Sequence, residues 1–127
     1  MANTFKNANI VGVTTILGET TSVAAAVADR AIANNPENSG NVFKINTIIA
    51  TNNNTTSAAV IHVNLYPQDD LGGQSNAIAH AITVPVNSSL IVIDKNSSFY
   101  LKENQSIGAN ATTTSSIVYT TSFEIIK

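Results

Sequence analysis

Residues 59–86 read AVIHVNLYPQDDLGGQSNAIAHAITVPV, which is two apolar, β-branched runs separated by a polar loop. In the first run apolar side chains alternate with polar ones, Ile61, Val63 and Leu65 against His62 and Asn64. Alternation with a period of two predicts a half-buried β-strand, which ends here at Tyr66-Pro67. Residues 68–74 then form the loop and residues 76–86 the return strand. The stretch therefore predicts an antiparallel hairpin.

The register of this hairpin decides where its two histidines lie. Symmetric pairing would set apolar residues of one strand against polar residues of the other. A shift of one residue matches the apolar faces far better, through the pairs Ile61 with Ile82 and Leu65 with Ile78. Because a buried face fixes register, we expect the shifted pairing, absorbed by a bulge or an asymmetric loop. It predicts that His62 points outward, while His80 lies on the inner face or near its edge.

The same pattern continues on both sides of the hairpin. Further strands are predicted over residues 41–51, 90–93, 98–102, 106–109 and 117–125, with turns or loops at residues 52–56, 94–96, 103–105 and 110–115. The expected core faces carry Phe43, Ile45 and Ile49 in the first of these strands, and Ile117, Tyr119, Phe123 and Ile125 in the last. Residues 90–93 (LIVI) are apolar on both faces, which predicts a strand buried on both sides.

The first third of the chain has a weaker pattern. Residues 9–17 predict a strand, whereas the Ala-rich residues 22–33 favour extended pairing but leave a short helix open. Residues 34–41 contain Pro and Gly and predict a loop. Residues 1–8 could form an N-terminal arm that reaches a neighbouring molecule.

Together these signals predict a single all-β domain over residues 1–127, a β-sandwich of jelly-roll-like type with about eight antiparallel strands. The composition predicts a core built mainly from Val, Ile, Leu and Ala, because aromatic residues make up only 6% and Trp is absent. Charged residues are only 11%, and Asn, Thr and Ser together number 44 of 127. A surface with so little charge repels copies of itself weakly, which favours a protein that packs against neighbours.

Charge and composition also speak against several classes of partner. With six Lys and Arg residues and a net charge of −2, the chain lacks the basic patch of a nucleic-acid-binding protein. It has neither a long apolar run nor an amphipathic basic segment, so we expect no membrane contact. It has no cysteine, and its first residues do not predict a signal peptide.

Candidate metal sites are weak in the sequence. His62 and His80 lie in one hairpin, with Asp69 or Asp70 as a third possible ligand, but the predicted register separates the histidines onto opposite faces. Asp69-Asp70 before Gly72-Gly73 suggests calcium, yet the spacing of an EF-hand is missing, and a solvated hairpin tip is favoured. We therefore predict no metal site and no cofactor.

Catalysis is not predicted either. The sequence contains no Gly-x-Ser-x-Gly motif and no phosphate-binding loop, and its carboxylates fall mostly in turns, at Glu37, Asp69, Asp70, Asp94 and Glu103. No catalytic, cofactor-binding or metal-ligating residue is assigned. Carbohydrate binding stays open, with Tyr66, Tyr100 and Tyr119 as the aromatic platforms on which a sugar could stack.

One family resemblance appears in residues 84–93 (VPVNSSLIVI) and residues 99–107 (FYLKENQSI), supported by residues 5–8 (FKNA) and the turn after residues 48–52. These segments resemble small structural proteins of tailed phages, notably those that infect cyanobacteria. The likeness covers most of the chain but is interrupted by the Ala-rich stretch and by residues 34–41. It implies a β-sandwich virion protein that oligomerises, and it transfers no functional residue.

The sequence thus predicts a non-enzymatic component of a phage virion, made in the host cytoplasm. A decoration protein of the head is preferred over a part of the neck or tail. Its expected partners are copies of itself, for example in a trimer, and a larger virion scaffold protein. The alternative is a receptor- or glycan-binding module of a tail fibre or similar appendage.

Overall fold

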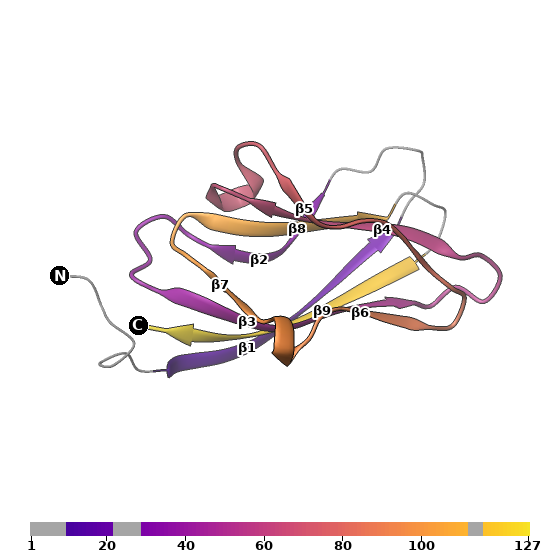
Figure 1. The fold of residues 1–127 in the computed structure, drawn as a ribbon, viewed down its shortest axis with the longest axis horizontal. Helices are drawn as coiled ribbons and strands as arrows, with labels where there is room; N and C mark the ends of the chain where they lie inside the picture. The colour runs from indigo at the N-terminus through magenta and orange to yellow at the C-terminus, as the bar shows by residue number, and fades with distance from the viewer. Residues whose placement is uncertain (1–9, 22–28, 112–115) are drawn as a thin grey trace.

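A computed structural model describes residues 10–21, 29–111 and 116–127, which form two β-sheets packed face to face (Figure 1). The described residues contain nine strands: β1 (Ile10–Thr21), β2 (Arg30–Asn35), β3 (Val42–Asn52), β4 (Ala59–Tyr66), β5 (Asn76–Val84), β6 (Ser89–Ile93), β7 (Phe99–Leu101), β8 (Gln105–Ala111) and β9 (Ser116–Ile126). Two single turns of 3-10 helix accompany them, η1 (Asp69–Leu71) and η2 (Lys95–Ser97). The predicted all-β sandwich is confirmed.

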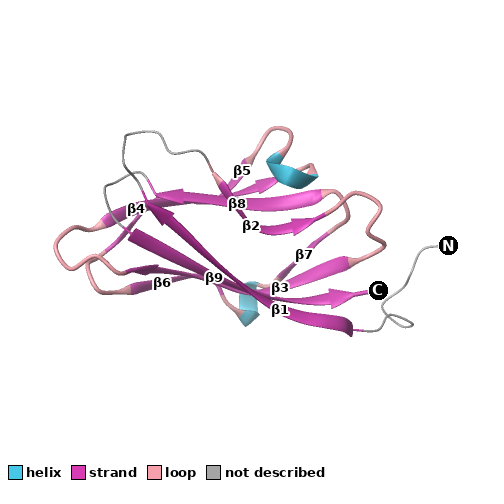
Figure 2. Cartoon of the chain, turned by 180° about the vertical axis from the view of Figure 1, so that it is seen from behind, coloured by secondary structure: helices cyan, strands magenta, loops and turns pink. Residues whose placement is uncertain are grey.

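The strands pair as a set of nested antiparallel hairpins. β4 pairs with β5, β3 with β6 and β7, β2 with β8, and β1 with β9. The chain therefore resembles one long hairpin, which is rolled up by two further pairings, β3 with β9 and β4 with β8. The resulting sheets have the orders β1-β9-β3-β6, with β7 also on β3, and β2-β8-β4-β5 (Figure 2). If β6 and β7 count as one strand interrupted by η2, this is an eight-stranded jelly roll.

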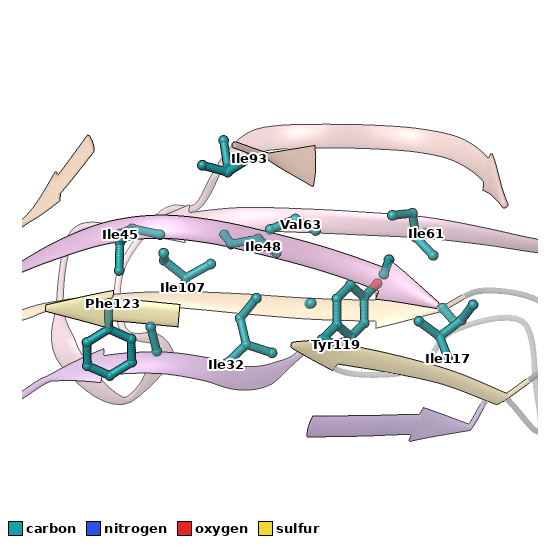
Figure 3. Packing of buried hydrophobic residues seen from close by; sticks show 14 of the residues in the cluster. Ile32, Ile45, Ile48, Ile61, Val63, Ile93, Ile107, Ile117, Tyr119 and Phe123 are labelled. Atoms are coloured by element: carbon teal, nitrogen blue, oxygen red, sulfur yellow. The ribbon is translucent and has the colours of Figure 1, made fainter. Parts of the chain in front are cut away.

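The core lies between the two sheets and consists mainly of aliphatic side chains (Figure 3). Each of the four long inner strands contributes fully buried residues, among them Ile45 and Ile48, Ile61 and Val63, Ile107, and Ile117. The rings of Phe43 and Phe123 stack with their centroids 4.7 Å apart. Burying one such aliphatic side chain contributes about 1.5–3 kcal/mol, so this layer is the main source of stability.

Strand β3 departs from the predicted alternation. Phe43 and Ile45 are buried as expected, but Ile48 and not Ile49 continues the core face. The cause is a bulge: Ile45 pairs with Phe123 while Thr47 pairs with Ser122, so Asn46 is an extra residue. One extra residue exchanges the two faces of everything that follows it.

The structure describes only part of the segment at residues 22–33. Residues 22–28, like residues 1–8 of the expected arm, lie outside the described residues. From Arg30 the chain is strand and not helix, and a bulge between Ala31 and Ala33 places both Ile32 and Ala33 in the core. The predicted loop over residues 34–41 starts too early, because β2 continues to Asn35.

Two buried asparagines explain how loops are closed at the ends of the sandwich. The Asn35 side-chain amide donates to the carbonyl oxygens of Asn41 (2.9 Å) and Leu101 (3.1 Å). The Asn52 amide likewise donates to the carbonyl oxygens of Ser57 (3.0 Å) and Val84 (3.1 Å). Buried polar groups need such partners, and part of the unusual Asn content serves this purpose.

Strand β6 is not buried on both sides, as the sequence predicted. It pairs only with β3 at the edge of its sheet, and Ile91 is 62% exposed. Strand β8 is longer than predicted and continues to Ala111, so only residues 112–115 of the expected loop remain, and they lie outside the described residues. Strand β1 is also longer than predicted and extends to Thr21.

Candidate functional site

The β4–β5 hairpin has the predicted shift at one end only. Ile61 pairs with Ile82, as expected, but Leu65 pairs with Asn76 and not with Ile78. Two bulges in β5 cause the difference, because two residues are added to β5 between Ile82 and Asn76. The first bulge places His80 and Ala81 opposite the single residue His62.

This bulge brings the two histidines together, contrary to the prediction. His80 is exposed, and its ring centroid lies 4.9 Å from that of His62, edge to face. His62 is the half-buried member of the pair, so the expected burial of the two histidines is also reversed. Bulges re-aim side chains in this way, and a register argument based on alternation alone could not place this one.

Beside the histidine pair, on the same outer face of the sheet β2-β8-β4-β5, lies a hydrogen-bonded cluster centred on Asp29. Its carboxylate accepts from Asn64 Nδ2 (2.9 Å), from the Tyr66 hydroxyl (2.6 Å) and from Asn110 Nδ2. The cluster, defined as Asp29, Asn64, Tyr66 and Asn110, joins the residue that precedes β2 to strands β4 and β8. The sequence analysis missed Asp29, because no motif surrounds it in the Ala-rich stretch.

Gly108 makes room for this cluster. A Cβ atom at that position would lie 2.9 Å from Leu71 Cδ2 and 3.0 Å from both Asp29 Cβ and Tyr66 Cε1. These distances are shorter than normal carbon–carbon contacts, so glycine at this outer-face position lets the Asp29 cluster sit close to the sheet.

The loop that carries Asp69 and Asp70 folds back over β8 and β2. The Leu71 amide donates to Ser106 Oγ (2.9 Å), and Ser106 Oγ donates to the Gln68 carbonyl (2.7 Å). Asp69 Oδ2 accepts from the Glu37 amide, and Asp70 Oδ1 accepts from the Asn34 side chain, both at 2.9 Å. Asp70 is exposed, as expected of a solvated hairpin tip, but the loop is also hydrogen-bonded to β2 and β8.

The two aspartates of this loop are used as local acceptors. In the part of the chain that the structure describes, no three His, Cys, Asp or Glu side chains gather in a group that could hold a metal ion.

Electrostatics distinguishes the members of this surface. Partial burial and the neighbouring His80 lower the pKa of His62, while Asp29 acts in the opposite direction. Burial and the hydrogen bond to Asp29 raise the pKa of Tyr66. Burial likewise raises the pKa of Tyr119. At neutral pH both tyrosines are hydroxyl donors, and the neutral form of His62 is favoured.

The three candidate tyrosines have different environments. Tyr119 is fully buried, and its hydroxyl crosses the core to donate to the Asn110 carbonyl of the opposite sheet at 2.8 Å (Figure 3). It is thereby excluded as a sugar-stacking platform. Tyr66 is half-buried in the Asp29 cluster. Tyr100 of β7 is 47% exposed and pairs in register with Lys44.

The opposite outer face, on the sheet β1-β9-β3-β6, has a different chemistry. Because Ile48, Ala50, Tyr119 and Thr121 point into the core, their strand neighbours point outward. We call this the threonine face and define it by the outward residues Thr47, Ile49, Thr51, Ile91, Val118, Thr120 and Ser122. All seven are uncharged, and six are half-buried within the sheet.

Comparison with other proteins provides no independent assignment of these surfaces. Neither a protein-family model nor a curated protein matches the chain. Among the described residues, no helix has the length and apolar character needed to span a membrane.

Proposed function

We propose that this chain is a non-enzymatic structural subunit of a tailed-phage virion that works by packing against copies of itself and against a larger virion protein. Head decoration is the preferred position, ahead of the neck or tail. The observation that carries the proposal is the threonine face, whose defining residues are uncharged and lie mainly on the central strands β3 and β9.

The chemistry of this face suits association. Many proteins place charged side chains at exposed sheet edges, where they discourage pairing with other sheets. Within β3 and β9 the charged residues are Lys44 and Glu124, which pair in register with each other at one end, and Glu19 of β1 is the register partner of Val118. Ile91 adds an exposed apolar side chain at the edge of the same face. Such a surface loses little solvation when a second copy covers it.

The jelly-roll topology supports the proposal as an analogy. Jelly rolls occur in viral capsid domains, but also in lectins and cupins, so the fold alone does not assign a function. A virion role is therefore supported by the threonine face and by the sequence resemblance to phage structural proteins, and not by the fold alone.

The direct test is the composition of purified phage particles that encode this chain. Quantitative mass spectrometry should find it in a fixed ratio to the major capsid protein, at many copies per particle. Its absence from washed particles would contradict the proposal.

A glycan- or receptor-binding module is the second candidate, and the exposed ring of Tyr100 is the observation that favours it. A tyrosine presents an apolar ring face with a polar hydroxyl at its tip, and a sugar could stack on such a face. This function predicts retention on an array of host-surface glycans that is lost in Tyr100→Ala and kept in Tyr66→Phe. Equal binding by both variants would exclude Tyr100 as the platform.

A further inference from the structure

The bulge in β5 is held by a side chain and not only by the backbone. β5 is an edge strand that pairs with β4 alone, and Ala81 within it has a φ of 53°, in the left-handed region that a residue with a Cβ rarely adopts. The Ala81 amide donates to Nδ1 of His62 at 3.3 Å. An imidazole lone pair thus accepts the amide hydrogen that the bulge withdraws from the β-ladder.

Only one protonation state of His62 can make this bond. A neutral imidazole has one nitrogen that accepts and one that donates, whereas both nitrogens of the imidazolium donate. Protonation at Nδ1 would therefore point the N–H of His62 at the N–H of Ala81. The Ala81 amide would lose this acceptor. Protonation would also place a positive charge close to His80, whose ring centroid is 4.9 Å away.

We propose that His62 and His80 form a proton-operated latch on the β5 edge, in which uptake of a proton by His62 releases the bulge at His80–Ala81. The latch is independent of the proposed function, because it concerns the conformation of one chain.

The groups that face His62 determine where the latch operates. His80 lies on β5, Asn110 is the register partner of His62 on β8, and Asp29 and Tyr66 lie in the neighbouring cluster. Burial, and then His80, lower the pKa of His62 from its ordinary 6.5, and the weaker effect of Asp29 raises it. More than half of His62 is therefore neutral at pH 6.5 and able to accept from Ala81, and the bond is lost as the pH falls through the pKa of the folded state.

The same geometry argues against a metal at this histidine pair. A histidine that binds a metal usually donates its other ring N–H to an acceptor. Nδ1 of His62 faces the Ala81 amide instead, which is a donor and not an acceptor. A proton, and not a metal ion, is the ligand that this arrangement senses.

The latch can be tested by NMR on the full chain at pH 7.5 and pH 5.0. We expect His62 to be the Nε2–H tautomer at pH 7.5, because Nδ1 accepts. The hydrogen-exchange protection factor of the Ala81 amide should fall at least about tenfold between the two pH values, a change in opening free energy of about 1.4 kcal/mol. The Val63 amide of the neighbouring strand should keep its protection.

His62→Asn is the matched variant, because Asn Oδ1 can replace Nδ1 as an acceptor but does not titrate. Ala81 protection in this variant should be independent of pH. An equal fall in His62→Asn and in the wild type would overturn the latch. So would an Nδ1–H tautomer of wild-type His62 at pH 7.5, a result that does not depend on whether the variant folds.

Discussion

The two outer faces of this sandwich differ in what their polar side chains contact. On the sheet β2-β8-β4-β5, the Asp29 cluster and the returning loop bond to one another, and Gly108 leaves room for them. On the threonine face, Thr51 and Ser89 share a side-chain hydrogen bond at the edge, and the remaining outward residues are small or apolar. The polar groups of the first face find their hydrogen-bond partners within the chain, whereas the second face is suited to a partner molecule. Substitutions on the first should change stability, and those on the second should change association.

The largest effect on stability is expected for Asp29→Ala. The substitution removes the shared acceptor of three side-chain donors, and hydrogen bonds to a charged group contribute about 1.5–3 kcal/mol each. Because the cluster is only partly buried, water replaces some of this loss, and we expect destabilisation by about 2–4 kcal/mol in urea unfolding.

The control for this variant is Glu103→Ala, which removes an exposed turn carboxylate. It should change the unfolding free energy by less than about 0.5 kcal/mol. If Asp29→Ala changed the unfolding free energy as little as Glu103→Ala, the Asp29 cluster would not stabilise this face.

Gly108→Ala tests the close approach of the cluster to β8. The added Cβ would contact Leu71, Asp29 and Tyr66 at 2.9–3.0 Å, and overpacking of this kind costs about 1–3 kcal/mol. Thermal unfolding should show a lower Tm for this variant. Ala109→Gly is not a suitable control because Ala109 is buried in the core, whereas Ala77→Gly changes an exposed strand residue and should be milder.

Tyr119→Phe is expected to have a smaller effect. It deletes the hydroxyl that joins the two sheets through the Asn110 carbonyl but keeps the ring in the core. A buried hydrogen bond contributes about 1 kcal/mol net, so the unfolding free energy should fall by about that amount. An unchanged free energy would show that this bond across the core adds nothing to stability.

The smallest predicted effect concerns the histidine pair. His80→Gln removes the Coulombic effect of His80 and should raise the pKa of His62 toward 6.5, while burial keeps it below that value. Asp29→Asn should lower the pKa of His62 further, because it removes the one charge that favours protonation. An NMR titration of the His62 ring measures both, and shifts of the same sign in the two variants would contradict this arrangement.

The sequence predicted the features that depend on alternation and on turn residues. The core faces of β4 and β9 are confirmed, including Ile61, Val63 and Tyr119, because uninterrupted strands keep their period of two. Errors began where a strand gained one residue. The bulge at Asn46 exchanges the two faces of the rest of β3, and the bulge at His80 and Ala81 brings the two histidines together. Neither bulge contains a glycine that could have indicated it in the sequence.

The Asp29 cluster could not be predicted for a different reason. Its members come from three separate places in the sequence, and only the rolled arrangement of the hairpins brings them together. Asn64 and Asn110 look like any other outward asparagines in a chain that has 17 of them. Because asparagine is common throughout the chain, its presence at residues 64 and 110 does not indicate that these two take part in a cluster.

The central claim, that the threonine face packs against other copies, is tested most directly by analytical ultracentrifugation of three proteins over a range of concentrations. The wild type should form a discrete oligomer, such as a trimer. Ile91→Lys, which adds a charge at the exposed edge of that face, should weaken association at least about tenfold, equivalent to about 1.4 kcal/mol. Val86→Lys adds the same charge in the loop between β5 and β6 and should associate like the wild type. A wild type that stays monomeric throughout, or equal weakening by both lysine variants, would contradict the account.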